Sequence, residues 1–287
     1  MKEIKIGIIG FGILGKALKH VFDIKFPVYV YDKYQKEYLD ITPVSKNADI
    51  IFLAIPTPMK DDGKIDLECV EDALKTISEA VKKEGRTPII VLRSTIIPRT
   101  TESLQKKYPQ TNLVFNPEFL TEKNFLNDMR NTSKIVIGSN NKESAEIVQQ
   151  VYKEIFPDAR YILTDTKTAE MIKYASNVTL SSQIMIANEL YQICQKLGID
   201  YETIRKTLLL DRRIGTNINV PGTDGDFGFG GKCFPKDLNA LISFAKENGY
   251  NPELLEQVWK TNIKLRKNHD WESIKGATSK NGFKSII

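Results

Sequence analysis

Short apolar runs alternate with longer amphipathic stretches through the first 165 residues. The first run, Ile4 to Ile9, is rich in β-branched residues and is followed by a helical pattern through Phe22. Further strand-length runs follow it: Val28–Tyr31, Ala48–Ile55, Pro88–Leu92, Leu113–Phe115, Lys134–Ile137 and Arg160–Leu163. Helical spacing places one apolar set on a single helix face: Leu67, Val70, Leu74, Ile77 and Val81. Strands that alternate with helices predict an α/β fold, with a doubly wound, parallel Rossmann domain over residues 1–165.

The pattern becomes entirely helical after Thr164. Four helices are predicted in this part: Thr168–Lys196, a helix capped by Asp200 that reaches Leu210, Lys236–Glu247 and Pro252–His269. The first is long enough to link two domains. Its later turns are expected to be buried because of their apolar residues, which are Ile184, Ile186, Leu190 and Ile193. Residues 166–287 are therefore expected to form an all-helical second domain.

A glycine turn lies between the first strand and the first helix. Gly10 and Gly15 fit a tight turn and close helix packing, while Gly12 lets a pyrophosphate reach the amides at the helix N-terminus. Asp32 ends the second strand at the distance where a carboxylate can bond the adenosine ribose. The spacing predicts dinucleotide binding, and the acid favours NAD, although the cation of Lys33 leaves NADP open.

Polar clusters follow three other strands of the predicted sheet. Pro56-Thr57-Pro58 forms a stiff loop, Arg93-Ser94-Thr95 follows the next strand, and Asn116-Pro117-Glu118-Phe119 follows the one after it. Ligands in such folds bind outside the carboxyl ends of the strands. Thr95 and Glu118 are therefore candidate site residues.

One cysteine, Cys233, stands between a glycine-rich loop and a predicted helix start. Gly230 and Gly231 let the backbone approach a ligand, and the proline two positions after the thiol fits a first helical turn. A helix N-terminus and the two neighbouring lysines favour the thiolate, which is the nucleophilic form. A structural cysteine buried in a turn is the alternative, but no apolar run surrounds Cys233, and Asp237 is a polar partner. We interpret Cys233 as a candidate nucleophile.

Three polar residues of the long helix, Glu170, Lys173 and Asn177, share one face because they lie three and seven positions apart. A short polar stripe on a helix is typical of a solvated surface. The helical pattern by itself therefore favours a surface position for all three.

Composition limits the classes of function. The chain has 287 residues, 41% of them hydrophobic, which suggests about two domains with ordinary cores. A net charge of +5 is spread along the chain, so it indicates small anionic ligands more than nucleic acid, and a solvated lysine-rich surface explains it equally well. Three distant cysteines fit neither a disulfide framework nor a zinc site. Without a membrane-length run or a signal-peptide cleavage site, we expect a cytoplasmic protein that has no metal and no membrane segment.

Six blocks of the sequence, in order, resemble the UDP-glucose/GDP-mannose dehydrogenase family, whose members oxidise a nucleotide-sugar alcohol to a uronate. The blocks span nearly the whole chain: Gly10–Gly15, Pro56–Pro58, Ser94–Thr95, Asn116–Leu120, Ala169–Tyr174 with Asn177, and Gly228–Asp237. The resemblance implies NAD as the cofactor, a nucleotide sugar (in the first place a UDP-sugar) as the substrate, and a homodimer formed through the helical domain.

The resemblance also implies roles for single residues. Cys233 is the covalent nucleophile, Lys173 and Asn177 bind the reacting oxygen with support from Asp237, and Glu118 with Thr95 handles proton transfer and water. The implied cofactor-binding residues are Gly10, Phe11, Gly12, Ile13, Leu14, Gly15, Asp32, Lys33, Pro56, Thr57, Ser94, Thr95 and Glu118. The implied substrate-binding residues are Glu118, Phe119, Leu120, Lys173, Asn177, Phe229, Gly230 and Cys233.

The sequence departs from the family pattern in two places. Arg99 stands where the family usually has glycine, and the sequence stops at Ile287, where members of usual length continue into a third, nucleotide-binding domain. Two alternatives therefore stay open. One is a hydroxy-acid or 6-phosphogluconate-like dehydrogenase, which has no use for Cys233, and the other is a truncated, catalytically impaired paralogue that binds a dinucleotide.

Overall fold

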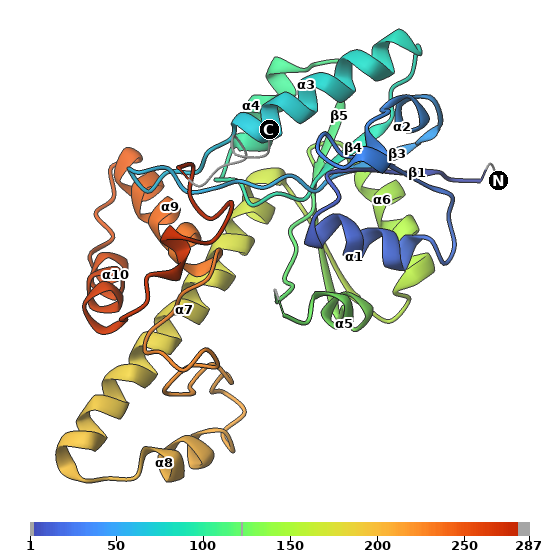
Figure 1. Ribbon diagram of the computed structural model, residues 1–287. Coiled ribbons are helices and arrows are strands. Elements are labelled where there is room, and N and C mark those ends of the chain that lie inside the picture. The colour runs from blue at the N-terminus through green and yellow to red at the C-terminus, as the bar shows by residue number, and fades with distance from the viewer. Residues whose placement is uncertain (1–2, 122, 281–287) are drawn as a thin grey trace. The chain divides into compact units, whose positions relative to one another are not determined.

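The computed structural model describes residues 3–121 and 123–280, and it divides into two compact units (Figure 1). Unit 1 contains the chain up to residue 57 and residues 67–173. Unit 2 joins residues 58–66 to the chain that follows residue 173. The chain thus passes between the units within the long helix, after Lys173, whereas the change of pattern lies at residue 165.

Unit 1 contains a seven-stranded sheet in the order β2-β1-β3-β4-β5-β6-β7. The strands are β1 (Ile6–Ile9), β2 (Val28–Tyr31), β3 (Ile50–Leu53), β4 (Ile89–Leu92), β5 (Asn112–Phe115), β6 (Lys134–Gly138) and β7 (Arg160–Thr164). The first five run parallel, and Ile6 of β1 lies opposite both Val28 and Ile50. Because β1 lies between β2 and β3, the chain moves to opposite sides after β1 and after β2. Open α/β sheets bind ligands at this kind of switch point.

The last two strands correct the expectation of a wholly parallel sheet. β6 and β7 are parallel to each other, but Phe115 of β5 pairs antiparallel with Gly138 of β6. A parallel connection has to carry the chain back along the strand, usually through a helix. Among the described residues, the connection from β5 to β6 contains only the short α5 (Phe125–Arg130), which is about 9 Å long.

Helices cover both faces of the sheet, and each face has its own hydrophobic core. On one face pack α1 (Ile13–Phe22), α5 and α6 (Lys142–Ile155); on the other pack α2 (Thr42–Asn47), α3 (Glu68–Lys83) and α4 (Thr100–Lys107). In β3, Ile50 and Phe52 belong to the first core, and Ile51 and Leu53 belong to the second. Burial on both faces explains why the central strands are continuously apolar.

Unit 2 is helical, as expected. Its elements are the larger part of α7 (Thr166–Leu197), α8 (Tyr201–Leu208), α9 (Phe234–Glu247), α10 (Glu253–Leu265) and the 3-10 turn η2 (Asp270–Glu272). The Asp200 carboxylate caps α8 by accepting the N–H groups of Glu202 and Thr203, as predicted. α10 ends before the predicted His269 because the backbone of Arg266 is extended. None of the described helices is both long and apolar enough to cross a bilayer.

Two further features of unit 2 differ from the sequence pattern. Residues 58–66 belong to it: the N–H of Met59 donates to the carbonyl of Ala277, and the N–H of Ser279 donates to the carbonyl of Met59. The later turns of α7 are not buried as expected, since Ile186, Leu190 and Ile193 are exposed and only Ile184 packs against a core. Ala187 and Cys194 form the buried side of these turns.

Candidate active site

The glycine turn after β1 is crowded by protein atoms at Gly10 and Gly15 but not at Gly12. Gly10 has a φ of 89°, and a Cβ there would lie 2.6 Å from the carbonyl oxygen of Ala54. A Cβ at Gly15 would lie 2.1 Å from the carbonyl oxygen of Gly10. At Gly12, which caps the N-terminus of α1, a Cβ would meet no protein atom within 4 Å. Two glycines are thus required by the fold, and the third faces open space at a helix N-terminus, which fits a dinucleotide pyrophosphate.

Asp32 lies beside this turn, where its predicted role requires it. Its carboxylate accepts the N–H of Phe11 at 2.7 Å and the N–H of Tyr34 at 2.8 Å. Lys33 forms an ion pair with Asp72 at 3.0 Å, which ties its charge to α3. The acid is therefore fixed at the turn, and the cation that left NADP open has an acidic partner of its own.

The loops after β3 and β4 are tied to each other by hydroxyl groups. Thr57 donates from Oγ1 to the carbonyl oxygen of Thr95 at 2.9 Å, and Ser94 donates from Oγ to the carbonyl oxygen of Ile55 at 2.5 Å. Both hydroxyls brace the loops at the edge of the sheet where the glycine turn also lies. Pro56 is exposed beside them.

Glu118 and Lys173 form a buried ion pair in unit 1. The Nζ of Lys173 lies 3.0 Å from Oε1 of Glu118, and the two side chains are 4% and 17% exposed. Burial alone would raise the pKa of Glu118, but Lys173, the N–H of Leu120 and the charge of Arg93 together lower it. Glu118 is therefore a carboxylate that can accept a proton. The Lys173 ammonium also lies 5.6 Å from the centre of the Phe119 ring, which Lys134 covers at 4.1 Å.

A buried network next to this pair was missed by the sequence interpretation. Arg93 is buried at the end of β4 and donates to the Asn116 side-chain oxygen and, at 3.0 Å, to the hydroxyl of Tyr152. Tyr152 donates to the same Asn116 oxygen at 2.6 Å, and the Asn116 amide donates to the carbonyl of Val136. The sequence signal that could have revealed this network is the cationic Arg93, which comes directly after an apolar strand. Arg93 contributes positive charge near Glu118.

The polar stripe on α7 is buried, so the solvated interpretation is wrong. Glu170 is completely buried and accepts the N–H of Arg99 at 2.6 Å and the N–H of Thr101 at 2.8 Å, at the start of α4. Burial raises its pKa to about 7 despite these bonds. Within the described part of the chain, Glu170 thus binds the backbone at the start of α4 and makes no hydrogen bond to a candidate site residue. Lys173 and Asn177, in contrast, each contact a candidate site residue within their own unit, Glu118 and Asp237.

Unit 2 holds the thiol and a second polar cluster. Cys233 is exposed and occupies the N-cap position of α9, so its placement at a helix start is confirmed. Asp237, in the first turn of α9, is buried, accepts a hydrogen bond from the Asn177 amide and forms an ion pair with Lys236. The sequence interpretation treated Lys236 only as a nearby cation. Phe229, expected at the substrate, instead packs its ring among Phe234 and Trp259 in the core.

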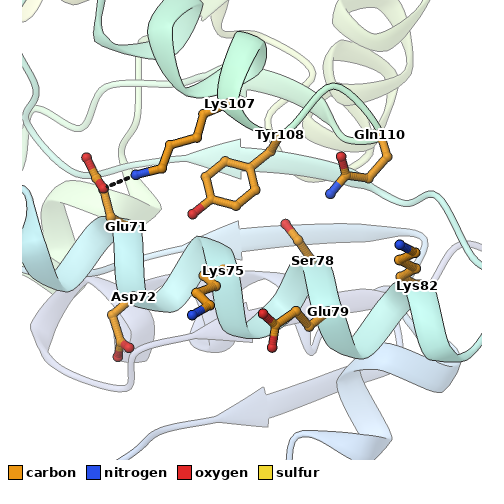
Figure 2. Close-up of a pocket in the computed structure, with 9 residues that line it drawn as sticks. All are labelled: Glu71, Asp72, Lys75, Ser78, Glu79, Lys82, Lys107, Tyr108 and Gln110. Carbon is orange, nitrogen blue, oxygen red and sulfur yellow. Dashed lines mark hydrogen bonds and ion pairs between the residues drawn. The ribbon is translucent and has the colours of Figure 1, made fainter.

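One surface groove of unit 1 contains none of the predicted site residues. It measures about 610 Å³ and lies between α3 and the end of α4 (Figure 2). Acidic and basic side chains line it in equal number, and Lys107 pairs with Glu71 across it. In the described part of the chain, no three histidine, cysteine or acidic side chains gather to hold a metal. The predicted site residues thus lie outside this groove, in the loops of unit 1, on α7 and around the start of α9.

Comparison with known proteins gives matches over most of the chain. Residues 29–156 match the NAD binding domain of the UDP-glucose/GDP-mannose dehydrogenase family, and residues 167–264 match its central domain. A UDP-glucose 6-dehydrogenase of Rickettsia bellii is 36% identical over 258 residues, which are 87% of this chain and 58% of that protein. The chain thus spans a little more than half the length of that relative.

Solved structures agree with this match. A UDP-glucose dehydrogenase from Pyrobaculum islandicum superposes with a TM-score of 0.82 at 27% identity, over 91% of this chain and 68% of that one. A 3-hydroxyisobutyrate dehydrogenase of Mycobacterium tuberculosis superposes with a TM-score of 0.70 at 15% identity, over 91% of this chain and 93% of that one. The second likeness concerns the fold alone.

Proposed function

The chain belongs to the UDP-glucose/GDP-mannose dehydrogenase family, and we propose that it oxidises the C6 alcohol of a nucleotide sugar to the uronate with NAD. The observation that carries the proposal is the exposed thiol of Cys233 at the start of α9. A hydroxy-acid dehydrogenase of similar fold makes one two-electron oxidation and has no step that needs a thiol. A four-electron oxidation needs a group that holds the aldehyde between its two steps.

The cofactor fits the residues of unit 1. The open side of Gly12 and the N-terminus of α1 suit the pyrophosphate, and the Asp32 carboxylate suits the ribose. Phe11, Ile13 and Leu14 complete this turn, and Thr57, Ser94 and Thr95 belong to the neighbouring loops. NAD would supply the hydride acceptor, with one NAD molecule used for each of the two oxidations.

The thiol of Cys233 carries the intermediate. After the first hydride has left the sugar carbon, the sulfur adds to the aldehyde carbonyl carbon and forms a thiohemiacetal. Loss of the second hydride from the same carbon, together with the proton of its hydroxyl group, leaves a thioester on Cys233. Water attacks this thioester, the carbon–sulfur bond breaks, and the thiolate and the uronate are released.

The charged groups have separate roles in this scheme. Lys173 and Asn177 stabilise the negative charge that develops on the reacting oxygen, and Asp237 holds Asn177 through its hydrogen bond. Glu118, kept ionised by Lys173, accepts a proton from the alcohol or from the attacking water, with Thr95 beside that water. Phe119 and Leu120 are proposed to contact the sugar.

We also propose a role for each domain, the class of the substrate and a homodimer. Residues 1–165 would bind NAD, and residues 166–287 would carry Cys233 and the contact between subunits. A UDP-sugar is the proposed substrate, because the relatives with the matching domains are UDP-glucose dehydrogenases. A homodimer would cover the apolar residues that α7 exposes.

NADH formation across a panel of nucleotide sugars tests the proposal, with the product identified by mass spectrometry. We expect one UDP-sugar to give two NADH for each uronate. One NADH for each product molecule would indicate a simple alcohol or hydroxy-acid dehydrogenase. Binding of NAD without turnover of any sugar would indicate an impaired paralogue.

A further inference from the structure

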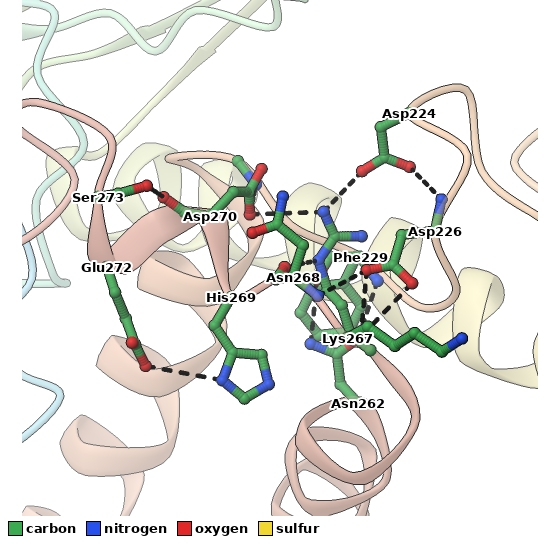
Figure 3. A network of polar contacts seen from close by, with 12 residues as sticks. Asp224, Asp226, Phe229, Asn262, Lys267, Asn268, His269, Asp270, Glu272 and Ser273 are labelled. Atoms are coloured by element: carbon green, nitrogen blue, oxygen red, sulfur yellow. Dashed lines mark hydrogen bonds and ion pairs between the residues drawn. The ribbon is translucent and has the colours of Figure 1, made fainter.

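The loop that leads to Cys233 is held by side chains of another segment (Figure 3). Residues 209–233 contain no helix or strand, so the backbone groups that do not bond within the loop need partners in other segments. Close to the thiol, three residues from the end of unit 2 supply such partners: Asn262 and Arg266, from the last turn and the end of α10, and Asp270, at the start of η2. Asn188 of α7 also accepts the N–H of Gly228 at 3.0 Å. We refer to Asn262, Arg266 and Asp270 as the α10 clamp.

Asn262 binds both backbone groups of one loop residue. Its Oδ1 accepts the N–H of Phe229 at 2.8 Å, and its Nδ2 donates to the carbonyl oxygen of Phe229 at 3.0 Å. The side chain is fully buried. Gly228, with a φ of 64°, passes so close that a Cβ there would lie 2.2 Å from Oδ1 of Asn262. The asparagine thus fixes the position of the loop four residues before the thiol.

Asp270 holds Gly231, two residues further along the loop, and Arg266 holds Phe227 and pairs with Asp270. Both Asp270 oxygens accept the N–H of Gly231 at 3.1 Å, and Arg266 pairs with Asp270 at 3.4 Å. The buried guanidinium also donates to the carbonyl of Phe227 and forms an ion pair with Asp224 at 2.6 Å. A Cβ at Gly230 would lie 2.3 Å from an Arg266 nitrogen and 2.4 Å from an Asp270 oxygen.

These contacts change the interpretation of the glycine-rich loop. Gly230 was expected to allow the close approach of a ligand, but the atoms that exclude a side chain there belong to Arg266 and Asp270. Gly228 is excluded in the same way by Asn262. Only Gly231, with a φ of 75°, has open space where its Cβ would be. Two of the three glycines therefore serve the clamp.

We propose that the α10 clamp positions the sulfur of Cys233 for reaction, with Asn262 and Asp270 as positioning residues. The clamp fixes the loop up to Gly231, and the α9 backbone begins with the bond from the Asp237 N–H to the Cys233 carbonyl at 2.8 Å. Lys232 is the one residue between the two fixed points. The thiol is thereby held at the helix N-terminus, where a thiolate is stabilised. The inference rests on the proposed role of Cys233 as nucleophile.

The test compares three full-length variants with the parent chain. Asn262→Ala removes both bonds to Phe229, and Asp270→Asn weakens the hold on Gly231 without changing size. Gln257→Ala is the matched control, because this amide lies exposed on the same helix. The first readout is the rate at which iodoacetamide alkylates Cys233 at neutral pH, quantified on its peptide by mass spectrometry. We expect a fall of about threefold or more in both clamp variants, because the thiol leaves the field of the helix N-terminus, and no change in the control.

The second readout is turnover. We expect kcat for uronate formation to fall about tenfold while KM for NAD stays constant, because a misplaced nucleophile changes the chemical step and not cofactor binding. A merely structural clamp lowers thermal stability but leaves the alkylation rate of the folded protein unchanged.

An alkylation rate in folded Asn262→Ala and Asp270→Asn that equals or exceeds the parent rate overturns the proposal. If Asn262→Ala does not fold, Asp270→Asn decides alone, since its carboxylate is partly exposed and the Asn262 bonds remain. Alkylation requires neither NAD nor a sugar. Failure of the parent to oxidise any nucleotide sugar therefore counts against the proposed function and leaves the alkylation result to decide the clamp.

Discussion

The ammonium of Lys173 on α7 lies 3.0 Å from the carboxylate of Glu118, which follows β5, and both side chains are shielded from water. A charge buried in this way is stable only while its partner is present. The pair therefore links the stability of unit 1 to the ionisation of the proposed base. Measurements of folding stability and of turnover can both test this link between the ion pair and the ionisation of Glu118.

Lys173→Met is expected to destabilise the protein by roughly 3–5 kcal/mol at pH 7, because it leaves the Glu118 charge buried and unpaired. In the parent, the lowered pKa of Glu118 contributes stability above its unfolded value of 4.5, and this contribution is lost as the pH falls through the folded pKa. In the variant, burial raises the pKa, so the sign reverses and stability falls as the pH rises above 4.5. Urea denaturation between pH 4 and pH 8 measures both slopes.

Two controls separate this effect from lost packing. Lys167→Met removes an exposed lysine of the same helix and should change stability by less than about 0.5 kcal/mol. The double variant Lys173→Met with Glu118→Gln removes the charge and should recover most of the loss. Equal stability of Lys173→Met and the parent at pH 7 would show that the pair has no role in folding.

Arg99→Gly is expected to stabilise the protein by about 1 kcal/mol. Arg99 has a φ of 77°, and the left-handed region costs a residue with a Cβ roughly 1–2 kcal/mol. The greater freedom of glycine in the unfolded chain offsets about 0.4–1 kcal/mol of this gain. The side chain is exposed, and the N–H that donates to Glu170 is retained. Arg99→Ala keeps the strained backbone, so a gain of equal size in Arg99→Ala would contradict the explanation.

NAD is expected to bind at least about tenfold more tightly than NADP, since the Asp32 carboxylate repels a 2′-phosphate. Calorimetric titration of both cofactors measures the ratio. Asp32→Ala should narrow it, while Lys33→Ala should leave it unchanged, because the Lys33 charge is paired with Asp72. A parent chain that prefers NADP would refute the role given to Asp32.

Cys233→Ser should lose at least about 10³-fold in uronate formation while NAD affinity stays at the parent value, because a hydroxyl is a much weaker nucleophile than a thiolate at neutral pH. Cys69→Ser, a change in α3 outside the proposed site, is the control and should keep parent activity. The measurement is steady-state uronate production with calorimetric titration of NAD. Uronate formed by Cys233→Ser at a rate close to the parent would exclude a covalent mechanism.

The chain is expected to be a homodimer in solution through the exposed apolar side of α7, where Ile186 is 63% exposed and Leu190 and Ile193 lie on the following turns. Ile186→Glu should shift it to a monomer, because a two-fold interface repeats the charge. Light scattering over a concentration series measures the mass. The matched control is Ile24→Glu, at an exposed isoleucine of unit 1. A constant mass of one 32.6 kDa chain for the parent would rule out the dimer.

Local pattern predicted most of the fold because each element is specified by residues close together in sequence. All seven strands lie within two residues of their expected ends, and the cap at Asp200 and the place of Cys233 at a helix N-terminus were correct. The helix itself begins at Phe234, two residues before the predicted Lys236. The antiparallel direction of β6 was not predictable in this way, because it depends on whether the connection from β5 carries the chain back along the whole strand.

The candidate site was only partly predictable for a similar reason. The position after a strand indicated Glu118, and the sequence around Cys233 indicated the thiol. Helical periodicity assigned Lys173 and Asn177 to the surface, and only the family resemblance gave these two residues a role in the site. Their burial depends on loops distant in sequence, such as the one that carries Glu118. The α10 clamp left no signal in any local window, because Asn262 and Phe229 lie 33 residues apart. A side chain that binds a loop distant in sequence can be identified only from a three-dimensional structure that contains the side chain and the loop.

The membership of residues 58–66 in unit 2 has a consequence for engineering. The chain passes between the units after residues 57, 66 and 173, so cutting the gene at one point does not yield either unit intact. A chimera that exchanges the cysteine-bearing unit between relatives has to transplant this nine-residue insert together with the helices. Otherwise Met59 of one parent has to pair with residues 277 and 279 of another. The chain therefore crosses between the units at three points, and a recombinant protein has to preserve all three crossings together.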